Sequence, residues 1–386
     1  MRESNTLYLL SLLFKLFSLI TSKTLTLNTF VIDNSFYIQY HKSLEEDVLF
    51  TQINQQLPFS WFNSKFLSKS AFKIKMNGDE KLINITIPPL QSNYSASIVS
   101  DSIIIDNVTI HHLLFYNVFI DNFSVVKNSF CFSFKQENPH FSMLHLLYEN
   151  KQIDKLQYSI SPYRGELYLG EVPEMAKEKI KYQSKCKIKN ERWGCTLQGV
   201  YITNNLTYFY DNKEGSALFQ FHEINIYCPK SFLSFFIQTV NENLSSTGQC
   251  IIEGNDNETY ISCQITSFPL IKSLVFEIDN FTFFIPIDKL FSCSEYGCFS
   301  VFHYSNRFDY LGDNTWVLGS FFLLNYLTIY DYEDESVSFL SQYLDITSKV
   351  NYFYDTKSIL VIIVFLVVIM IVMIILNLFI KIQNIR

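Results

Sequence analysis

The sequence predicts an all-β protein with a transmembrane helix near its C-terminus. Most of the chain consists of short apolar runs, often alternating, separated by Asn, Asp, Ser and Lys, which is the pattern of short strands and turns. Aromatic residues make up 17% of the chain, with 37 Phe and 24 Tyr, and aromatic side chains favour strands. One long apolar run, Ile359–Ile380, stands apart from this pattern.

The size and charge of the chain limit its class. With 386 residues and 48% hydrophobic content, it has enough apolar surface for one large or two medium domains with substantial cores. The formal net charge is −7 and no basic block occurs. Because phosphate binding needs clustered Lys and Arg, we do not expect nucleic acid as a partner.

The N-terminal residues 1–22 are expected to form a signal peptide. Arg2 precedes an apolar core, Leu7–Thr21, and cleavage is expected near Ser22, as in secretory leaders. Lys15 interrupts the apolar core. An uncleaved N-terminal anchor is therefore the alternative.

The apolar run at residues 359–380 is expected to span a membrane. At ~1.5 Å rise per residue, a helix of this length crosses a hydrocarbon core of about 30 Å. Lys381 and Arg386 follow it in a tail, residues 381–386, that is expected to be cytoplasmic. A lipid-anchor signal is less favoured, because such a signal usually ends apolar. With a polar stalk at residues 346–358, the sequence indicates a single-pass type I membrane protein.

Glycosylation sequons and cysteines agree with a lumenal or extracellular domain, in the secretory pathway or at the cell surface. Asn-x-Ser/Thr triplets lie only between the two apolar ends. They begin at Asn84, Asn93, Asn107, Asn122, Asn205, Asn243, Asn257 and Asn280. The eight cysteines of an exported chain imply disulfides. No clustered Cys/His spacing suggests a metal site, and no glycine-rich phosphate loop suggests a nucleotide cofactor.

The strand-like runs recur along the whole ectodomain. They include Ile98–Ile105, Val108–Phe119, Glu166–Leu169, Leu274–Ile278 and Phe281–Ile287. Only two segments outside the apolar ends have helical spacing. The first is Phe141–Asn150; the second is Lys230–Val240, where Pro229 stands just ahead of the first turn, as is common at helix starts.

The segment Trp316–Asp331, which reads Trp-Val-Leu-Gly-Ser-Phe-Phe-Leu-Leu-Asn-Tyr-Leu-Thr-Ile-Tyr-Asp, resembles the closing strands of a pepsin-like aspartic protease (peptidase A1). Further matches follow in the family's order from about residue 36 to residue 340. The resemblance implies a bilobal β fold. We expect an N-terminal lobe at residues 23–160 and a C-terminal lobe at residues 161–345.

The first lobe carries three of these matches. Phe36–Tyr40 is similar to the family's opening strand, and Val48–Asn54 to the strand that enters the active site. Trp61 lies seven residues after Asn54, where the family places the Trp of its Asp-Thr-Gly-Ser-Ser-x-x-Trp block.

The second lobe matches better. Gly165–Gly170 resembles the family's glycine-bracketed strand, and Ser216–Gln220 resembles the approach to the second catalytic aspartate. Pro229 lies nine residues beyond Gln220, which is the family's spacing for the proline after the second Asp-Thr-Gly.

Both positions where the family keeps its catalytic aspartates hold amides, Asn54 and Gln220. In an aspartic protease, two close carboxyl groups share a proton, so the pair supplies an acid and a base to activate water. An amide does not titrate in a useful range and cannot accept the water proton. The sequence therefore predicts no catalytic residues at this site.

Neighbouring positions also depart from the family. Gln56 and His222 replace the glycine of each loop, and Ile87–Leu90, with two prolines, stands where the flap Tyr is expected. We expect Asn54, Gln220, His222 and Glu223 to line a remodelled cleft. An acid/base pair formed by His222 and Glu223 is the less favoured interpretation.

The resemblance also implies one disulfide, Cys263–Cys293, which is similar to the family's second-lobe bridge. Cys186 and Cys195 are close enough in the chain to close a hairpin, and Cys228 is a candidate partner for Cys250. Cys131 and Cys298 then remain, and Cys298 competes with Cys293 for Cys263.

Three functions from different classes are compatible with these features. The favoured one is a membrane-anchored pseudoprotease that binds a peptide or protein in its cleft, because extended peptides pair with strand edges without any catalytic group. The second is an active aspartic endopeptidase whose aspartates lie elsewhere. The third is a non-catalytic surface or adhesion protein that keeps only the scaffold.

Overall fold

The computed structural model of this chain describes most of residues 23–348. The segments that it does not describe within this range are 33–34, 41–48, 56–59, 64–71, 74–82, 88–91, 106–107, 119–128, 137, 203–206, 209–214, 244–248, 265–272, 295–296 and 343–345. The chain divides into two compact units, Met1–Thr347 and Ser348–Arg386, and the description below concerns the first. The expected signal peptide and membrane span lie outside the described residues. None of the described helices has both the length and the apolar character needed to cross a membrane.

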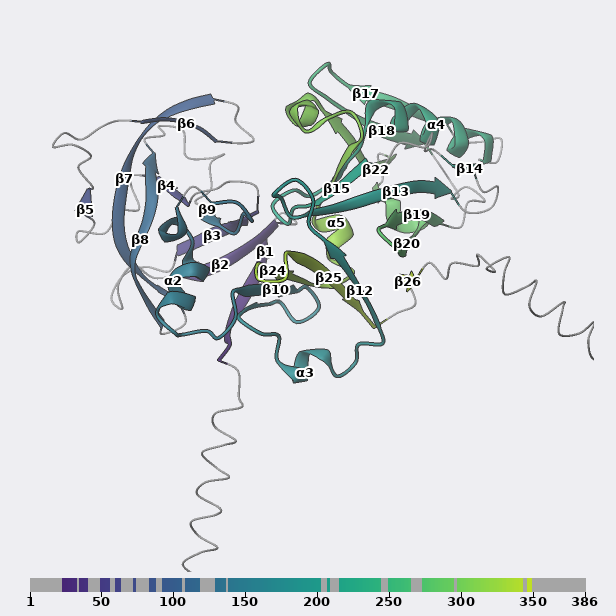
Figure 1. The fold of residues 1–386 in the computed structure, drawn as a ribbon. Helices are drawn as coiled ribbons and strands as arrows, with labels where there is room; N and C mark the ends of the chain where they lie inside the picture. Colours follow the sequence, from purple (N-terminus) through teal and green to yellow (C-terminus); the bar gives the residue numbers. More distant parts are fainter. Residues whose placement is uncertain are drawn as a thin grey trace, which may run out of the picture. The chain divides into compact units, whose positions relative to one another are not determined.

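The described chain is mostly β-structure, as predicted (Figure 1). Its first strands form one part of a mixed sheet, with both antiparallel and parallel pairs. These strands are β1 (Leu25–Ile32), β2 (Ser35–Tyr40), β3 (Leu49–Asn54), β4 (Trp61–Asn63), β5 (Phe72–Lys73), β6 (Ile83–Ile87), β7 (Ser92–Ile105), β8 (Val108–Val118) and β9 (Ser129–Cys131). They follow the order β1-β2-β3-β9-β4-β8-β7-β5, with β6 paired to β7. The predicted strands at Phe36–Tyr40 and Val48–Asn54 are confirmed as β2 and β3.

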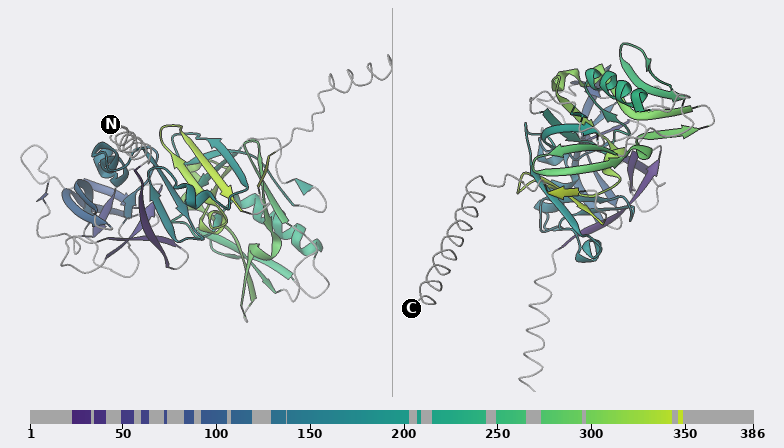
Figure 2. Two further views of the ribbon diagram at one scale, coloured as in Figure 1. Left: turned by 90° about the horizontal axis from the view of Figure 1, so that it is seen from below. Right: turned by 90° about the vertical axis from the view of Figure 1, so that its right-hand side faces the viewer.

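Strands from the middle and the end of the chain extend this array beyond β1. They are β10 (Gln157–Ser161), β11 (Glu166–Leu169), β12 (Tyr182–Lys187), β24 (Leu327–Asp331) and β25 (Ser336–Ser341). Their order is β12-β25-β24-β10-β11-β1. Figure 2 shows the yellow-green strands β24 and β25 among the teal strands from the middle of the sequence. Because β10 pairs with both β11 and β24, the end of the described chain is tied to its centre.

A second sheet is formed by the remaining strands. They are β13 (Gly194–Ile202), β14 (Thr207–Tyr208), β15 (Gly215–Phe219), β16 (Ile226–Tyr227), β17 (Gln249–Gly254), β18 (Glu258–Gln264), β19 (Ser273–Ile278), β20 (Phe281–Pro286), β21 (Phe291–Ser294), β22 (Gly297–Ser305), β23 (Thr315–Leu318) and β26 (Ile346–Ser348). The order is β17-β18-β22-β16-β23-β15-β13-β19-β20-β26. The pairing of β15 with β23 is parallel, which brings the strand before Gln220 beside the Trp-Val-Leu strand.

Helices are few and short in the described part of the chain. They are α2 (Met143–Glu149), α3 (Glu174–Lys177), α4 (Lys230–Asn243) and α5 (Ser320–Leu323), with the 3₁₀ turns η2 (Pro139–Phe141), η3 (Ile287–Leu290) and η4 (Asn306–Leu311). Both predicted helices are present. The first is preceded by η2, and Ser142 caps α2 by accepting a hydrogen bond from the backbone of His145, as an N-cap serine does.

Burial differs between strands whose sequences both alternate. Along β12, buried residues alternate with exposed residues over most of the strand, which is the signature of a strand with one face toward the core. The sequence of β10, Gln-Tyr-Ser-Ile-Ser, also alternates between polar and apolar residues, yet all five residues are buried. The position of β10 inside the sheet, between β11 and β24, accounts for the burial of its polar face.

The disulfides differ from the pairing that the resemblance implied. The structure contains Cys186–Cys195, Cys250–Cys263 and Cys293–Cys298, while Cys131 and Cys228 are buried thiols outside any disulfide. The hairpin bridge Cys186–Cys195 is confirmed. The expected bridge Cys263–Cys293 is wrong, as are Cys228–Cys250 and Cys131–Cys298. The reason is strand register: Cys298 on β22 lies between Cys263 on β18 and Cys293 on β21.

Two of the sequons lie in exposed turns. Asn257 is in the turn between β17 and β18, and Asn280 in the turn between β19 and β20. The backbone of Asn84, Asn93 and Asn243 is in β6, β7 and α4. Asn107, Asn122 and Asn205 lie outside the described residues.

Candidate functional site

The first candidate loop begins at Asn54, the last residue of β3. Its backbone is opposite Cys131, at the end of the parallel strand β9. Ser60 fixes the return of the loop: its Oγ donates to the Phe141 carbonyl at 2.6 Å and accepts from the Cys131 amide at 2.9 Å. The side chain of Asn54 and all of Gln56 lie outside the described part of the structure. The role of Asn54 in lining the cleft stays a prediction.

The second candidate loop begins at Gln220, directly after β15. Gln220 is only 5% exposed, and its amide donates to the Leu318 carbonyl of β23 at 3.1 Å. Within the described residues, its Oε1 atom has no hydrogen-bond partner. The loop closes on itself, because the Glu223 amide donates to the Gln220 carbonyl at 3.2 Å. An uncharged amide is thus held at the root of this loop.

Gln55, the residue after Asn54, joins the two loops. Its Oε1 accepts a hydrogen bond from the Phe221 amide at 2.6 Å, and its Nε2 donates to the Tyr158 hydroxyl at 3.1 Å. Gln55 is 4% exposed, and Phe221 and Tyr158 are fully buried. Burial raises the pKa of Tyr158 well above its ordinary value, so its hydroxyl stays protonated and donates to the Phe132 carbonyl at 3.3 Å.

We expect Gln55→Leu to lower the free energy of unfolding by about 1–3 kcal/mol, because a buried backbone donor at Phe221 then loses its acceptor. Denaturant unfolding of the two proteins measures this difference. Gln238→Leu is the matched control, since Gln238 lies on the exposed side of α4 and donates to Glu242 at 2.9 Å; this change is expected to stay within about 0.5 kcal/mol. Equal effects of the two substitutions would contradict the bridging role.

A buried ion pair stands beside the second loop. Glu223 is 8% exposed, and its Oε2 accepts from the Arg307 guanidinium at 2.6 Å. The second oxygen of Glu223 is 3.6 Å from Nε2 of His222. Burial lowers the pKa of His222, although the Glu223 carboxylate opposes this. Glu223 is thus shared between Arg307 and His222, and an acid/base pair formed by His222 and Glu223 stays the less favoured interpretation.

Arg307 comes from η4 and lies 84 residues beyond Glu223 in the chain. Its guanidinium carbon lies 4.8 Å from the ring centre of Tyr227 and 4.6 Å from that of Phe308, distances typical of cation–π contacts. The arginine thus pairs with Glu223 and packs between two rings. No local spacing in the sequence links residue 307 to residue 223.

The glycine of the Trp-Val-Leu-Gly block allows a close approach to the second loop. A Cβ atom at Gly319 would lie 2.2 Å from the Asn225 carbonyl oxygen and 2.7 Å from that of Glu223. The Gly319 amide donates to Asn225 at 3.2 Å, and the Ser320 amide donates to Glu223 at 2.6 Å. Any larger side chain would separate these two segments, so the block positions the loop that carries Glu223.

Aromatic residues pack beneath Gln55. The ring of Tyr158 stacks on Tyr330, with centroids 4.6 Å apart, and the edge of Trp193 meets Tyr330 at 5.1 Å. The indole Nε1 of Trp193 donates to the Phe132 carbonyl at 2.6 Å. Trp193 therefore contacts Phe132, Tyr158 and Tyr330, which come from three parts of the chain, and it supports the aromatic cluster that packs next to Gln55.

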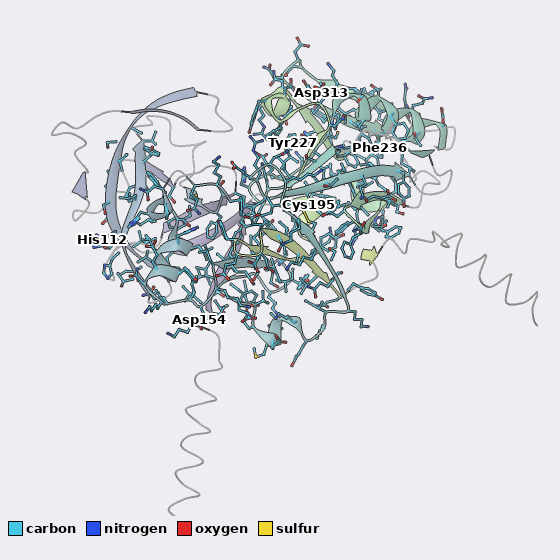
Figure 3. All side chains as sticks on the ribbon, viewed as in Figure 1. His112, Asp154, Cys195, Tyr227, Phe236 and Asp313 are labelled. Carbon is cyan, nitrogen blue, oxygen red and sulfur yellow. A yellow bond between two sulfur atoms is a disulfide. The ribbon has the colours of Figure 1, made fainter. Side chains whose placement is uncertain are left out.

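A pocket of about 350 Å³ lies between α4, η4 and β23. Tyr227 and Asp313, both labelled in Figure 3, line it together with Cys228, Ser231, Tyr304 and Phe308. Burial raises the pKa of the Cys228 thiol well above its ordinary value, so this thiol is a wall of the pocket and not a nucleophile. Tyr227 also contacts Arg307, which connects the pocket to the ion pair of the second loop.

The comparison with protein families identifies the chain. A family model described as eukaryotic aspartyl protease matches residues 92–342, which is about two thirds of the sequence. The chain therefore belongs to the eukaryotic aspartyl protease family. The match includes Gln220, His222, Glu223 and the Trp-Val-Leu-Gly block, whereas Asn54 precedes it. No curated protein matches the chain.

Proposed function

We propose that this chain is a membrane-anchored, aspartic-protease-like protein that binds peptide or protein segments without cleaving them. The observation that carries the proposal is the chemistry of the second loop, where a buried amide, Gln220, occupies the position expected for a carboxylate. Glu223, the acidic residue nearest to it in sequence, is neutralised by Arg307 at 2.6 Å. A carboxylate paired with a guanidinium is a weaker base toward water than a free carboxylate.

Two further features, the bridge formed by Gln55 and the replacement of the loop glycines, support the absence of proteolytic activity. Gln55 uses its amide to join the two loops, and its hydrogen-bonding groups are therefore not available to a reacting molecule. Replacement of the loop glycines by Gln56 and His222 adds side chains where the family has none. These changes leave the strand framework in place, and strand edges recognise extended peptides through backbone hydrogen bonds.

Acid-dependent proteolysis is the first test. We expect purified protein to show no cleavage of a peptide library between about pH 3 and pH 7. The variant Asn54→Asp/Gln220→Asp is also expected to stay inactive, because His222 and Gln56 still occupy the glycine positions of the loops. Mass spectrometry of the digests measures both. Cleavage by the wild-type protein that a statine-like inhibitor blocks would establish the alternative, an active endopeptidase.

Peptide binding is the second test, and it is measured by fluorescence polarisation with labelled peptides from the same library. Ser231→Trp is expected to weaken binding about tenfold by filling the pocket beside Tyr227. Ser234→Trp is the matched control, since Ser234 lies exposed on the same helix and does not line the pocket. Binding of no peptide at all would favour the third function, a surface or adhesion scaffold.

The proposal includes passage through the secretory pathway, with a signal peptide at residues 1–22, a membrane span at residues 359–380 and N-glycosylation. Three disulfides in the described residues suit an oxidising compartment. The exposed turns at Asn257 and Asn280 suit glycan attachment. Membrane extraction and glycosidase digestion of the expressed chain test these two assignments.

The mature N-terminus is expected to be Lys23, and N-terminal sequencing checks it. The nitrogen of Lys23 donates to Oδ2 of Asp154 at 2.6 Å, and its Nζ donates to the Lys151 carbonyl at 3.3 Å; Asp154 is labelled in Figure 3. After cleavage this nitrogen becomes an ammonium group facing a carboxylate, an attractive pair. A sequence starting at Met1 would instead indicate an uncleaved anchor.

A further inference from the structure

Four cysteines form a continuous row across adjacent strands of the second sheet. Cys250 on β17 is opposite Cys263 on β18, Cys263 is opposite Cys298 on β22, and Cys298 is opposite Cys293 on β21. Residues directly opposite each other on neighbouring strands project to the same face and are in contact distance. Each sulfur in the middle of the row therefore has two cysteine neighbours.

The two disulfides use only the outer neighbours. Cys250 is bonded to Cys263, and Cys293 to Cys298, each with a Cα–Cα distance of 4.0 Å. The central neighbours, Cys263 and Cys298, are in register but not bonded to each other. The same row can also hold a single central bond, Cys263–Cys298, with a cysteine left over at each end.

The four cysteines of the row differ in solvent exposure, so an external thiol can approach the row from one end only. Cys293 is exposed, whereas Cys298, Cys263 and Cys250 are 6%, 1% and 2% exposed. A thiol from outside can therefore reach Cys293 first. At the other end, Asn241 of α4 accepts from the Cys250 amide at 2.8 Å and donates to the Cys250 carbonyl at 3.1 Å, which holds the edge strand in place whether or not Cys250 is bonded.

We propose that this row is a thiol–disulfide exchange site that captures a thiol-bearing molecule, a low-mass thiol or a cysteine of another protein, at Cys293. The incoming thiolate attacks Sγ of Cys293, forms a mixed disulfide and expels the thiolate of Cys298. The Cys298 thiolate then attacks Sγ of Cys263, forms Cys263–Cys298 and expels the thiolate of Cys250, which takes up a proton. One thiol enters, one thiol is released, and no net oxidation or reduction occurs.

Register and order favour this relay over simple opening of one bond. An attacking sulfur, the attacked sulfur and the leaving sulfur must succeed one another in exchange, and the row places Cys298, Cys263 and Cys250 in that order. The third disulfide, Cys186–Cys195, joins β12 and β13, with its Cα atoms 6.0 Å apart. The row lies on other strands, so among the described cysteines none is placed beside this bridge as Cys298 is beside Cys263. It serves as an internal control.

The test uses the full chain in detergent with reduced glutathione as the probe at about pH 8, where enough thiolate is present. After acid quenching, denaturation and alkylation, peptide mapping should find glutathione on Cys293, a Cys263–Cys298 bridge and an alkylated Cys250. After denaturation, Cys131 and Cys228 should be alkylated with or without glutathione, since neither forms a disulfide, and Cys186–Cys195 should remain intact. Alkylated Cys298 beside an intact Cys250–Cys263 bridge would overturn the relay, as would the absence of any adduct.

The variant Cys250→Ser tests the same row without an added thiol. Without Cys250, Cys263 either remains a thiol or forms a disulfide with Cys298. We expect mapping of this variant to find Cys263–Cys298 and a Cys293 thiol that reacts in the native protein with a maleimide. A retained Cys293–Cys298 bridge with a free Cys263 would contradict the proposal. The glutathione experiment needs no substitution, so the proposal stays testable if this variant does not fold.

Discussion

Arg307→Met is expected to lower the free energy of unfolding by about 3–5 kcal/mol, because it leaves the carboxylate of Glu223 buried without its partner. The side chains of Glu223 and Arg307 are 9% and 17% exposed, so water solvates the unpaired carboxylate only weakly. Denaturant unfolding at neutral pH measures the loss.

The double variant Glu223→Leu/Arg307→Met decides how this loss is interpreted. Replacing a buried pair with apolar side chains is often nearly neutral, so we expect the double variant to lie within about 1 kcal/mol of the wild type. Lys185→Met is the matched control, because the pair Lys185–Asp334 is exposed, and its effect should stay below about 1 kcal/mol. A double variant as unstable as Arg307→Met would show that packing of the arginine, and not its charge, holds η4.

Trp193→Ala is the second substitution with a large expected effect, a loss of about 3–5 kcal/mol. Trp193 is 2% exposed, and its ring lies 4.7 Å from Tyr332 and 5.8 Å from Tyr158. Truncation opens a cavity beneath Gln55 and removes a buried hydrogen bond to Phe132. We therefore expect a weaker near-ultraviolet circular dichroism signal in addition to the lower unfolding midpoint.

Two controls separate these contributions. Trp193→Phe keeps most of the apolar volume and loses the indole donor, so its cost should be nearer to about 1–3 kcal/mol. Tyr310→Ala removes a ring that is 61% exposed and should change stability by less than about 1 kcal/mol. A loss below 1 kcal/mol for Trp193→Ala would mean that the aromatic cluster does not support the loops.

The strands and the longer helices could be predicted from local sequence patterns. β11 has the predicted bounds, Glu166–Leu169, and α4 begins at the predicted residue, Lys230, because the proline before it favours a helix start. The helix continues to Asn243, three residues past the prediction, where polar residues obscure the apolar period. α3 and α5 have four residues each, which is too short for any period to appear.

The candidate site could be predicted from the sequence in part. The positions of Gln220, His222 and Glu223 after a buried strand follow from the spacing to Pro229, and the structure places all three on one loop. Gln55 was missed, although its place next to Asn54 could have drawn attention to it. Arg307 was missed because 84 residues separate it from Glu223, and sequence periodicity reports only contacts within one element.

By itself, the sequence determined the β class of this protein and its family resemblance, because these depend on residue identity and on short-range spacing. The same resemblance predicts amides, Asn54 and Gln220, where the family has carboxylates. Tertiary structure alone decided the ion pair of Glu223 with Arg307, the bridge from Gln55 to Phe221, and the pairing of Cys250 with Cys263 and of Cys293 with Cys298. The first two contacts join segments that lie far apart in the chain, and the cysteine pairing follows strand register. No local pattern of residues encodes either of these.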